Sequence, residues 1–524
     1  MTPPSQSEGA ASGSDLERAP YPGSKRMPRW GLDELSEPPK IGFKNFLGMM
    51  GPGLLMGVAA IGGGEWLLGP VLSAEYGGAL LWVGTVSILL QVVFNVECSR
   101  YALYTGEPIM SGMMRTFLGP VFWISFYLLF DFGSFFQFKV ASAVAPVLAL
   151  ATGEMPDPGD TGLLTTMSYV IWILLLIPLF IGGKIYRTLK ILMTVKLVVV
   201  LGVLGSIAVF YSSWSTWSEI LLGFLQFGNI PLRDGESVNV FVNLFQGVSL
   251  PPIELKTVGL LTAFAAIAGW GGLGQMAVSN YTRDEGWGMG SKVGAIPSMI
   301  GGGGVKLSHV GCVFRVTSQS LQYWKGWLKR VRFDQYCLYV PTAMVGIALP
   351  SMLAIEFLSG VKVESNDWLI AGMTAEAVRD AIGGWMGIFF WYMLMVCGFL
   401  ILVPSTTVGV DSTVRRWVDT FWTAIPGLRK WNPSEVKKLY FYILLFKALM
   451  TMVGLSIGSP VALLLIYGTL SNFALGFVSF HTLYVNLTLL PDELKPCWLQ
   501  RIGVCVCGVF YLFLGGLMTW IKFA

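Results

Sequence analysis

Long apolar segments alternate with short polar stretches along most of the chain. A helix of about 20 apolar residues crosses the roughly 30 Å hydrocarbon core of a bilayer, and about eleven segments are long enough. The pattern predicts an all-α polytopic membrane protein. Its expected spans are approximately 46–72, 78–104, 119–150, 165–183, 191–213, 257–281, 335–359, 383–409, 438–457, 461–488 and 501–522.

The first span contains an interruption. Within Gly51 to Pro70, three glycines, Gly62, Gly63 and Gly64, precede the carboxylate of Glu65. Each glycine costs a helix about 1 kcal/mol relative to alanine, and a carboxylate at the bilayer centre costs about 2.5–3.5 kcal/mol. Such features indicate a helix that unwinds around a buried site. The alternative is a glycine-lined packing face with a salt-bridged Glu65.

The sixth span has a second interruption, also rich in glycine. It comprises Gly269, Trp270, Gly271, Gly272 and Gly274. Two interrupted helices, five spans apart and of opposite direction, are typical of an inverted five-plus-five repeat. In that architecture the substrate lies between the two breaks near the membrane midplane, so we expect the binding site there.

This organisation divides the chain into five parts. The polar first part, rich in Pro, Ser and Gly, is expected to be disordered, and Gln322 to Arg332 is expected to form an interfacial helix. The expected parts are a cytoplasmic tail (1–43), a first repeat (44–213), an extracytoplasmic loop (214–256), a second repeat (257–490) with a basic cytoplasmic insert (282–334), and a last span with the C-terminus (491–524).

Lysine and arginine are distributed unevenly between the two sides of the membrane. The loop at 184–190 carries three basic residues, whereas the loop before the fourth span carries Glu154, Asp157 and Asp160 and no basic residue. Because cytoplasmic loops are richer in Lys and Arg, we expect a cytoplasmic N-terminus and an extracytoplasmic C-terminus. The expected location is a bacterial-type inner, or plasma, membrane.

Composition restricts the function. The chain is 54% hydrophobic and 13% charged, against about 25% charged residues in soluble proteins. A net charge of +4 gives no reason to expect a nucleic-acid partner, and seven cysteines and two histidines form no cluster of metal ligands in the sequence. No nucleophile–base constellation indicates an enzyme, and no cofactor is expected. The expected partners are an ion or small molecule, protons and the lipid bilayer; the oligomeric state stays open, and a monomer fits the sequence.

Several motifs resemble a known family. The stretches GPGLLMGVAAIGGGEW, YGGALLWVGTVSILLQ and YALYTGEP resemble the start of the Nramp family of proton-coupled divalent-metal transporters. GFLILVPSTTVGVDSTVRRW is similar to that family's eighth helix, and LLIYGTLSNFALGFVSF to its tenth. The resemblance implies the LeuT-type fold of the amino acid–polyamine–organocation superfamily, with helices 1 and 6 broken.

The chain departs from the family at the metal ligands. Gly62 to Glu65 stand where the family has Asp-Pro-Gly-Asn, and the sixth span lacks the family's Met-Pro-His. The thioether that favours soft transition metals is therefore missing. Where the family places acidic proton-path residues, the third span has Asp131 and Lys139. We expect Glu65 to act as a substitute metal ligand or as a proton carrier.

The fifth span carries a second resemblance. KILMTVKLVVVL, from Lys190 to Leu201, resembles the fifth helix of proton-coupled amino acid transporters of the same superfamily. The resemblance implies that Lys196 replaces a sodium ion at the second ion site, where a buried ammonium can release and take up a proton. The alternative is that Lys190 and Lys196 both extend to the inner interface. Lys196 lies about 9 Å deeper along the helix.

The remaining candidates are polar or aromatic residues near the two breaks and in the eighth and tenth spans. The expected substrate-binding residues are Gly62, Gly63, Gly64, Glu65, Trp66, Gly269, Trp270, Gly271, Gly272, Gln275 and Asn472. The expected ion- or proton-coupling residues are Glu65, Lys196, Asp131, Lys139, Ser405 and Thr406. The alternative roles are packing for the tryptophans, interhelical hydrogen bonds for the amides and bonds to i−4 carbonyls for the hydroxyls.

These observations predict a secondary active transporter, related to Nramp, that moves a cation and is coupled to protons. The cation is expected to be a divalent metal ion bound by a ligand set unlike that of the family. One alternative is a proton-coupled transporter of a small organic solute such as an amino acid or amine. Another is a receptor or scaffold on the same fold that transports nothing.

Overall fold

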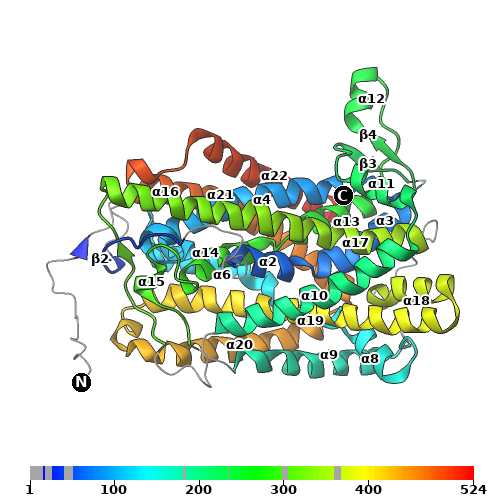
Figure 1. Ribbon diagram of the computed structural model, residues 1–524, viewed down its shortest axis with the longest axis horizontal. Coiled ribbons are helices and arrows are strands. Elements are labelled where there is room, and N and C mark those ends of the chain that lie inside the picture. Colours follow the sequence, from blue (N-terminus) through cyan, green and yellow to red (C-terminus); the bar gives the residue numbers. More distant parts are fainter. Residues whose placement is uncertain are drawn as a thin grey trace.

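Eleven long apolar helices dominate the computed structural model, which describes residues 16–17, 26–39, 51–157, 159–180, 185–233, 235–297, 305–358 and 368–523. They run side by side along the longest axis of the molecule (Figure 1). Their bounds are Pro52–Tyr76, Trp82–Thr105, Gly119–Thr152, Thr161–Leu179, Ile185–Tyr211, Leu255–Asp284, Ser318–Leu358, Gly384–Ala424, Pro433–Leu455, Pro460–Leu489 and Trp498–Phe523. The predicted number and order of spans are confirmed.

The first span is broken where the glycines are. Helix α2 (Pro52–Ala60) ends before Gly62, and the chain continues as the π-helical turn η3 (Gly64–Leu68) and helix α3 (Gly69–Tyr76). All residues from Gly51 to Pro70 are buried. The break therefore lies inside the protein, where its free backbone groups can find partners.

The sixth span is broken in a similar way. Helix α13 (Leu255–Ile267) stops, and the chain resumes as the 3₁₀ turn η6 (Gly272–Met276) and helix α14 (Ala277–Asp284). Gly269, Gly271 and Gly272 have φ values of 86°, 67° and 56°, which residues with a side chain rarely adopt. Glycine is needed at these three positions for that reason. Both predicted breaks are confirmed.

The third span contains a break that the sequence analysis missed. Helix α6 (Gly119–Asp131) leads into the 3₁₀ turn η4 (Phe132–Phe135), followed by the short helix α7 (Phe138–Ser142) and helix α8 (Val144–Thr152). Asp131 and Lys139 therefore lie on different helical segments.

Two spans are much longer than a membrane requires. Helix α16 (Ser318–Phe333), the π-helical turn η7 (Asp334–Tyr339) and helix α17 (Val340–Leu358) form one continuous rod, and α19 (Gly384–Ala424) has 41 residues. At 1.5 Å per residue such a rod is about 60 Å long. The predicted interfacial helix at 322–332 is thus part of the seventh span. Its Trp324 and Trp327 are buried in protein, which corrects the expectation of an interfacial helix.

The other elements complete the bundle and its connections. The helices are α4 (Trp82–Thr105), α5 (Ile109–Met114), α9 (Thr161–Leu176), η5 (Ile177–Leu179), α10 (Ile185–Tyr211), α11 (Trp214–Gly223), α12 (Val240–Gln246), α15 (Gly290–Val293), α18 (Ile370–Ile382), η8 (Leu428–Lys430), η9 (Pro433–Glu435), α20 (Val436–Leu455), α21 (Pro460–Leu489), η10 (Asp492–Leu494) and α22 (Trp498–Phe523). The strands are β1 (Leu16–Glu17), β2 (Trp30–Leu32), β3 (Asn229–Pro231), β4 (Ser237–Asn239) and β5 (Cys312–Val313).

Part of the N-terminal segment is folded against the bundle. Strand β2 pairs in parallel with β5 and antiparallel with β1. Trp30 is 1% exposed, and its Nε1 donates to Glu107 Oε2 at 3.1 Å. Disorder was predicted for 1–43, and this is wrong for residues 26–39, because a buried tryptophan and strand pairing outweigh the polar composition around them. The other residues of 1–43, apart from β1, lie outside the described part of the chain.

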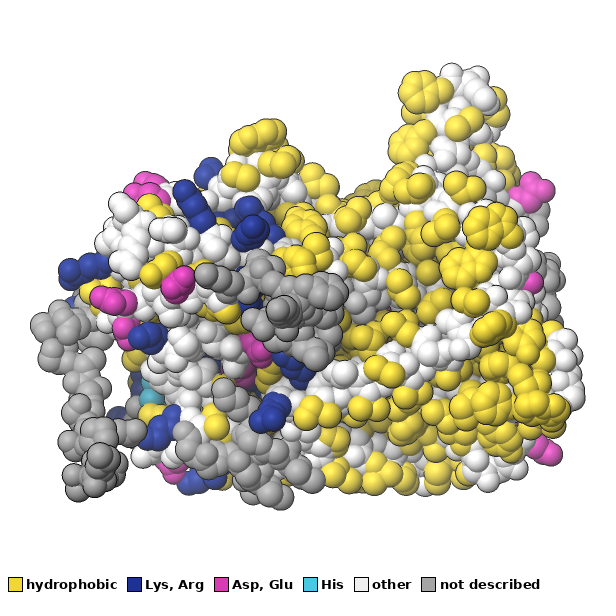
Figure 2. Space-filling model, viewed as in Figure 1, with side chains coloured by type: hydrophobic (Ala, Val, Ile, Leu, Met, Phe, Trp, Pro, Cys, Tyr) yellow, Lys and Arg dark blue, Asp and Glu magenta, His cyan; other side chains and the backbone are white. Residues whose placement is uncertain are grey.

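Charged and hydrophobic side chains occupy different parts of the surface. Lysine and arginine side chains gather at the end of the molecule where β2 lies, acidic side chains appear at both ends, and hydrophobic side chains cover most of the rest of the visible face (Figure 2). An apolar belt around a helical bundle suits a lipid environment. Which end faces the cytoplasm stays a prediction.

Candidate functional site

A single carboxylate joins the two helix breaks. Glu65 is fully buried; its Oε2 accepts a hydrogen bond from the Gly62 backbone N–H at 3.0 Å, and its Oε1 accepts from the Gly269 N–H at 3.1 Å. Backbone donors exposed by a helix break attract anions. Glu65 supplies that anion from within the chain and holds the first and sixth spans together.

The break in the sixth span is also held by polar side chains that the sequence analysis did not select. Gln91 of α4 accepts from the Trp270 N–H at 3.2 Å and from the Tyr339 hydroxyl at 2.8 Å. Its Nε2 donates to the Ala268 carbonyl at 2.7 Å and to the Tyr511 hydroxyl at 2.8 Å. The available signal was an amide within an otherwise apolar span, which commonly marks an interhelical contact.

Lys196 lies in a cage of oxygen atoms. Its Nζ donates to the Val58 carbonyl at 2.8 Å, the Ile401 carbonyl at 3.3 Å and Ser405 Oγ at 2.5 Å, and also to the Ile61 carbonyl. Its side chain is fully buried, so the alternative in which Lys196 extends to the interface is wrong. The ammonium joins the first, fifth and eighth spans directly beside the break in the first span.

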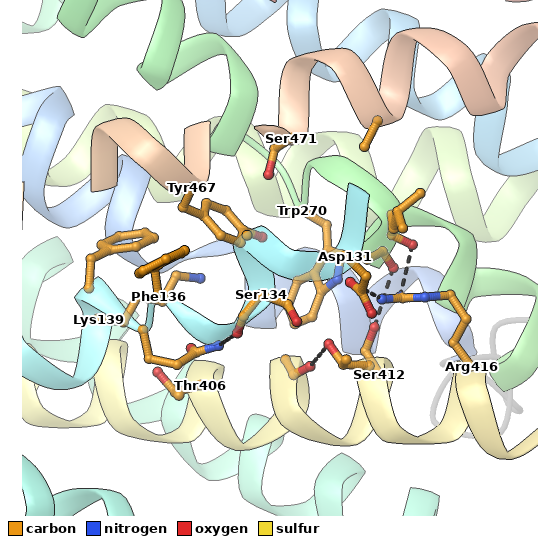
Figure 3. A pocket seen from close by; sticks show the side chains of 18 of the residues that line it. Asp131, Ser134, Phe136, Lys139, Trp270, Thr406, Ser412, Arg416, Tyr467 and Ser471 are labelled. Atoms are coloured by element: carbon orange, nitrogen blue, oxygen red, sulfur yellow. Dashed lines mark hydrogen bonds and ion pairs between the residues drawn. The ribbon is translucent and has the colours of Figure 1, made fainter. Parts of the chain in front are cut away.

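A small cavity lies near these groups (Figure 3). Its volume is about 60 Å³, and its walls come from the third-span break, the sixth-span break, α19 and α21. The lining residues are Phe130, Asp131, Gly133, Ser134, Phe136, Gln137, Phe138, Lys139, Trp270, Leu273, Gly274, Ser405, Thr406, Gly409, Ser412, Thr413, Arg416, Tyr467, Ser471 and Ala474.

The charged residues of the cavity lie at its two ends, with Lys139 at one and Asp131 with Arg416 at the other (Figure 3). Asp131 accepts from Arg416 at 2.7 Å and from Trp417 Nε1 at 2.5 Å, so its charge is balanced. Lys139 Nζ lies 5.7 Å from the centroid of the Trp270 ring. The three charged lining residues together carry one excess positive charge, which belongs to Lys139.

Lys139 also touches the break in the first span. A Cβ at Gly62 would come within 2.9 Å of Lys139 Nζ, and one at Gly63 would overlap the Phe138 ring. The glycines therefore let the third span approach the first closely enough to place the ammonium beside the break, within electrostatic reach of Glu65. The glycine run was predicted to surround a site, and its close contact is with Lys139 and Phe138.

Some predicted site residues line the cavity and others do not. Trp270, Lys139, Asp131, Ser405 and Thr406 do. Ten residues at or near the two breaks or on α21 do not, and neither does Lys196 of α10. The ten are Gly62, Gly63, Gly64, Glu65, Trp66, Gly269, Gly271, Gly272, Gln275 and Asn472.

Three of the non-lining residues make contacts between helices. Trp66 Nε1 donates to the Ala371 carbonyl at 3.0 Å, so its indole packs against α18. Gln275 Nε2 donates to Asn95 Oδ1 at 2.7 Å, and Asn472 Nδ2 donates to the Thr262 carbonyl at 3.1 Å. These contacts fit the alternative roles of packing and interhelical bonding.

The hydroxyls of the eighth span divide between two roles. Ser405 accepts from Lys196 and donates to the Ile61 carbonyl at 3.1 Å. Thr406 donates to the Leu402 carbonyl of its own helix at 2.8 Å, which is the i−4 bond given as its alternative. Ser405 is thus the hydroxyl that takes part in the oxygen cage.

Nearer the end of the bundle where β2 lies, five buried charged residues of α14 and α19 form an inner network. Arg283 pairs with Asp284 at 2.6 Å and with Asp419 at 2.5 Å; Arg415 pairs with Asp411 at 3.0 Å and also with Asp284. All five are at most 4% exposed. None of the five was among the predicted site residues.

Residues that suit a metal ion are sparse. Within the described ranges, no three or more His, Cys, Asp or Glu side chains come together as a metal-binding group. Glu65 was predicted as a tentative metal ligand, and both of its oxygens accept backbone N–H groups.

Comparisons with known proteins identify the fold. No family model and no curated protein matches the chain. Among solved structures, the manganese transporter of Eremococcus coleocola in complex with an aromatic bis-isothiourea compound aligns with a TM-score of 0.58 at 13% identity, over 93% of this chain and 97% of that one. A mutant of the same transporter aligns with a TM-score of 0.56 at 12% identity over the same shares. The predicted LeuT-type fold, with its five-plus-five inverted repeat, is confirmed; membership of the Nramp family stays a prediction.

Proposed function

We propose that this chain is a proton-coupled secondary transporter of a small organic solute that carries a carboxylate group. The observation that carries the proposal is the Lys139 ammonium at one end of the cavity, beside the break in the first span. The fold and the two facing helix breaks support transport in general, because this architecture binds substrates between its broken helices.

Charge favours the organic solute over the predicted metal cation. Among the residues that line the cavity, Lys139 is the charged group left after Asp131 is paired with Arg416, and its closest opposite influence is Glu65, which does not line the cavity. A positive wall in a site of low dielectric repels a cation and attracts an anionic group. Glu65, the carboxylate expected to hold the metal, already bridges the two breaks.

The volume of the cavity restricts the size of the solute. A cavity of 60 Å³ has room for about four to six water molecules, at about 10–15 Å³ of this measure for each. That is the size of acetate or glycine. A carboxylate would face Lys139, and the apolar part of the solute would face Trp270, whose ring lies beside the ammonium.

Lys196 is the group proposed to couple transport to protons. Its ammonium donates to oxygens of both α2 and α19. Loss of its proton removes the positive charge that joins these spans, so protonation favours the arrangement in which they are joined. A difference in stability between two arrangements is what proton coupling requires.

Binding is tested first by thermal denaturation of the purified full-length protein. A ligand at a hundredfold excess over its Kd stabilises the folded state by about 2.7 kcal/mol. Acetate, glycine and L-alanine are compared with ethylamine, Mg²⁺ and Mn²⁺, in the native protein and in Lys139→Met. The exposed Lys437→Met serves as the control, because it removes the same charge on α20.

We expect at least one carboxylate solute to raise the midpoint of thermal denaturation of the native protein and of Lys437→Met, and to leave that of Lys139→Met unchanged. Stabilisation by Mg²⁺ or Mn²⁺ alone would contradict the organic solute and favour the predicted cation transporter. Uptake of the bound solute into vesicles under an imposed pH gradient then tests transport. Binding without uptake would favour the receptor interpretation.

A further inference from the structure

The loop between the fifth and sixth spans forms a structured arm. It leaves α10 at Tyr211, passes through α11, β3, β4 and α12, and reaches α13 at Leu255. Three hydrogen bonds fix its base to the bundle. Trp82 Nε1 donates to the Asn229 carbonyl at 3.0 Å, Thr85 Oγ1 to the Phe224 carbonyl at 2.9 Å, and the Tyr76 hydroxyl to the Leu232 carbonyl at 3.2 Å.

The base of the arm lies at the depth where spans begin and end. Tyr76 is the last residue of α3, and Trp82 is the first residue of α4. From there β3, β4 and α12 project sideways, at a steep angle to the spans (Figure 1). Because the spans run across the membrane, the arm extends along the membrane surface and not away from it.

The tip of the arm is apolar and uncovered. Phe245 is 92% exposed, Leu244 75%, Phe241 56% and Val248 54%. No charged residue occurs from Ser237 to Leu250. Asn239 caps α12 by accepting from the Phe241 and Val242 N–H groups, so the helix is formed although these side chains pack against little protein.

The apolar surface of the arm continues the apolar surface of the bundle. On α11 and just after it, Leu221, Leu222 and Leu225 are 58–64% exposed. Figure 2 shows hydrophobic side chains running from the flank of the bundle onto the arm. The flank of a spanning bundle meets lipid, and a surface continuous with it, free of charge and parallel to the membrane, suits the same environment.

We propose that the arm inserts its tip into the lipid interface of the membrane leaflet at this end of the bundle. With the predicted orientation this is the outer leaflet. A second copy of the chain is a poorer occupant, because α12 has seven residues and is only about 10 Å long. A stable interface takes about 800 Å² from each partner.

The test uses the full-length protein in phosphatidylcholine vesicles, with a nitroxide attached at Phe245→Cys. The exposed Cys337 and Cys497 are first changed to serine. Collisions with oxygen, which concentrates in lipid, are compared with collisions with a water-soluble nickel complex. Arg233→Cys, an exposed position in the turn between β3 and β4, is the matched control, and Val248→Cys repeats the measurement should Phe245→Cys disturb the arm.

We expect the label at 245 to be reached by oxygen and protected from nickel, and the label at 233 to be reached by nickel. Equal access of nickel to both positions would overturn the proposal. A short distance between the 245 labels of two chains, with the same protection, would assign the tip to a second copy and would also overturn it. Neither outcome depends on the identity of the transported solute.

Discussion

Two groups of buried charges differ in what they face. In the inner network, Arg283 and Arg415 meet carboxylates of their own and the neighbouring helix. At the centre, Lys196 faces carbonyls and a hydroxyl, and Lys139 faces a cavity. A charge held by an opposite charge keeps its protonation state. A charge held by neutral dipoles can lose its proton without leaving a second charge unpaired.

The contrast separates charges that stabilise the fold from charges that we expect to act in transport. Breaking a buried ion pair leaves one charge uncompensated, so the inner network resists change and keeps α14 against α19. The central lysines are unfavourable to bury and lie where the helices are broken, which is typical of functional charges in a membrane. The following variants test this division, in order of expected effect.

The largest effect is expected for Lys196→Met. It leaves the carbonyls of Val58, Ile61 and Ile401 without this donor, at about 1–3 kcal/mol for each unsatisfied buried group, and it removes the proposed coupling charge. We expect uptake driven by a pH gradient to fall to the level of empty vesicles. Lys190→Met, on the same helix but paired with Glu285 nearer the surface, is the control. Native uptake by Lys196→Met would refute the coupling role.

The second effect is a loss of stability in Arg415→Met. Removing one partner of a buried pair costs about 3–5 kcal/mol, because Asp411 and Asp284 are left without this partner. We expect a lower midpoint of thermal denaturation and an unchanged stabilisation by bound solute. Combining the variant with Asp411→Asn should cost less than the sum of the two, since the second change removes one uncompensated charge. Additive losses would place Arg415 outside a coupled network.

A third, smaller effect concerns pH. Burial opposes the charge on Glu107, but Arg115, with Trp30 and Tyr101 as further donors, holds the pKa of that carboxyl below its usual 4.5. This contribution to stability is complete above 4.5 and is lost as the pH falls through the lowered folded value.

We therefore expect Glu107→Gln to lower the unfolding free energy by about 3 kcal/mol at neutral pH, at the lower end of the range for breaking a buried ion pair, because the glutamine keeps an acceptor oxygen for Arg115, Trp30 and Tyr101. It should also make stability less dependent on pH in the acidic range. Denaturation midpoints of the native protein and the variant, measured from neutral to acidic pH, check this. Parallel curves would show that Glu107 is not the group that titrates.

The smallest effect is expected for Ser405→Ala, which removes one oxygen of four from the Lys196 cage. A single hydrogen bond contributes about 0.5–1.5 kcal/mol, so uptake should decrease and remain measurable, with an altered dependence on pH. Thr420→Ala, which removes a bond to the Arg416 carbonyl of the same helix, is the control. A complete loss of uptake in Ser405→Ala would mean that the hydroxyl does more than support Lys196.

The spans and two of the breaks could be predicted from the sequence alone. Span length and hydrophobicity are local properties, so eleven helices could be located from composition along the chain. The breaks at Gly62–Gly64 and Gly269–Gly272 could be found because glycine disfavours a helix wherever it occurs. Lys196 could be selected for two reasons. Helical rise places it deeper in its span than Lys190, and its segment resembles the fifth helix of proton-coupled amino acid transporters.

Which groups meet depends on the packing of the helices and could not be predicted. Among Phe132–Phe136 the chain has a single glycine, Gly133, and the turn there depends on how this segment packs. That Glu65 bridges two breaks, that Gln91 holds one of them, and that Trp66 packs on α18 all depend on which helix faces are apposed. Residues 26–39 read as a polar tail because composition does not reveal that Trp30 has a buried partner. Apolar periodicity places a residue along a span, whereas its partner is set by the packing of helices far apart in the chain, which no local pattern encodes.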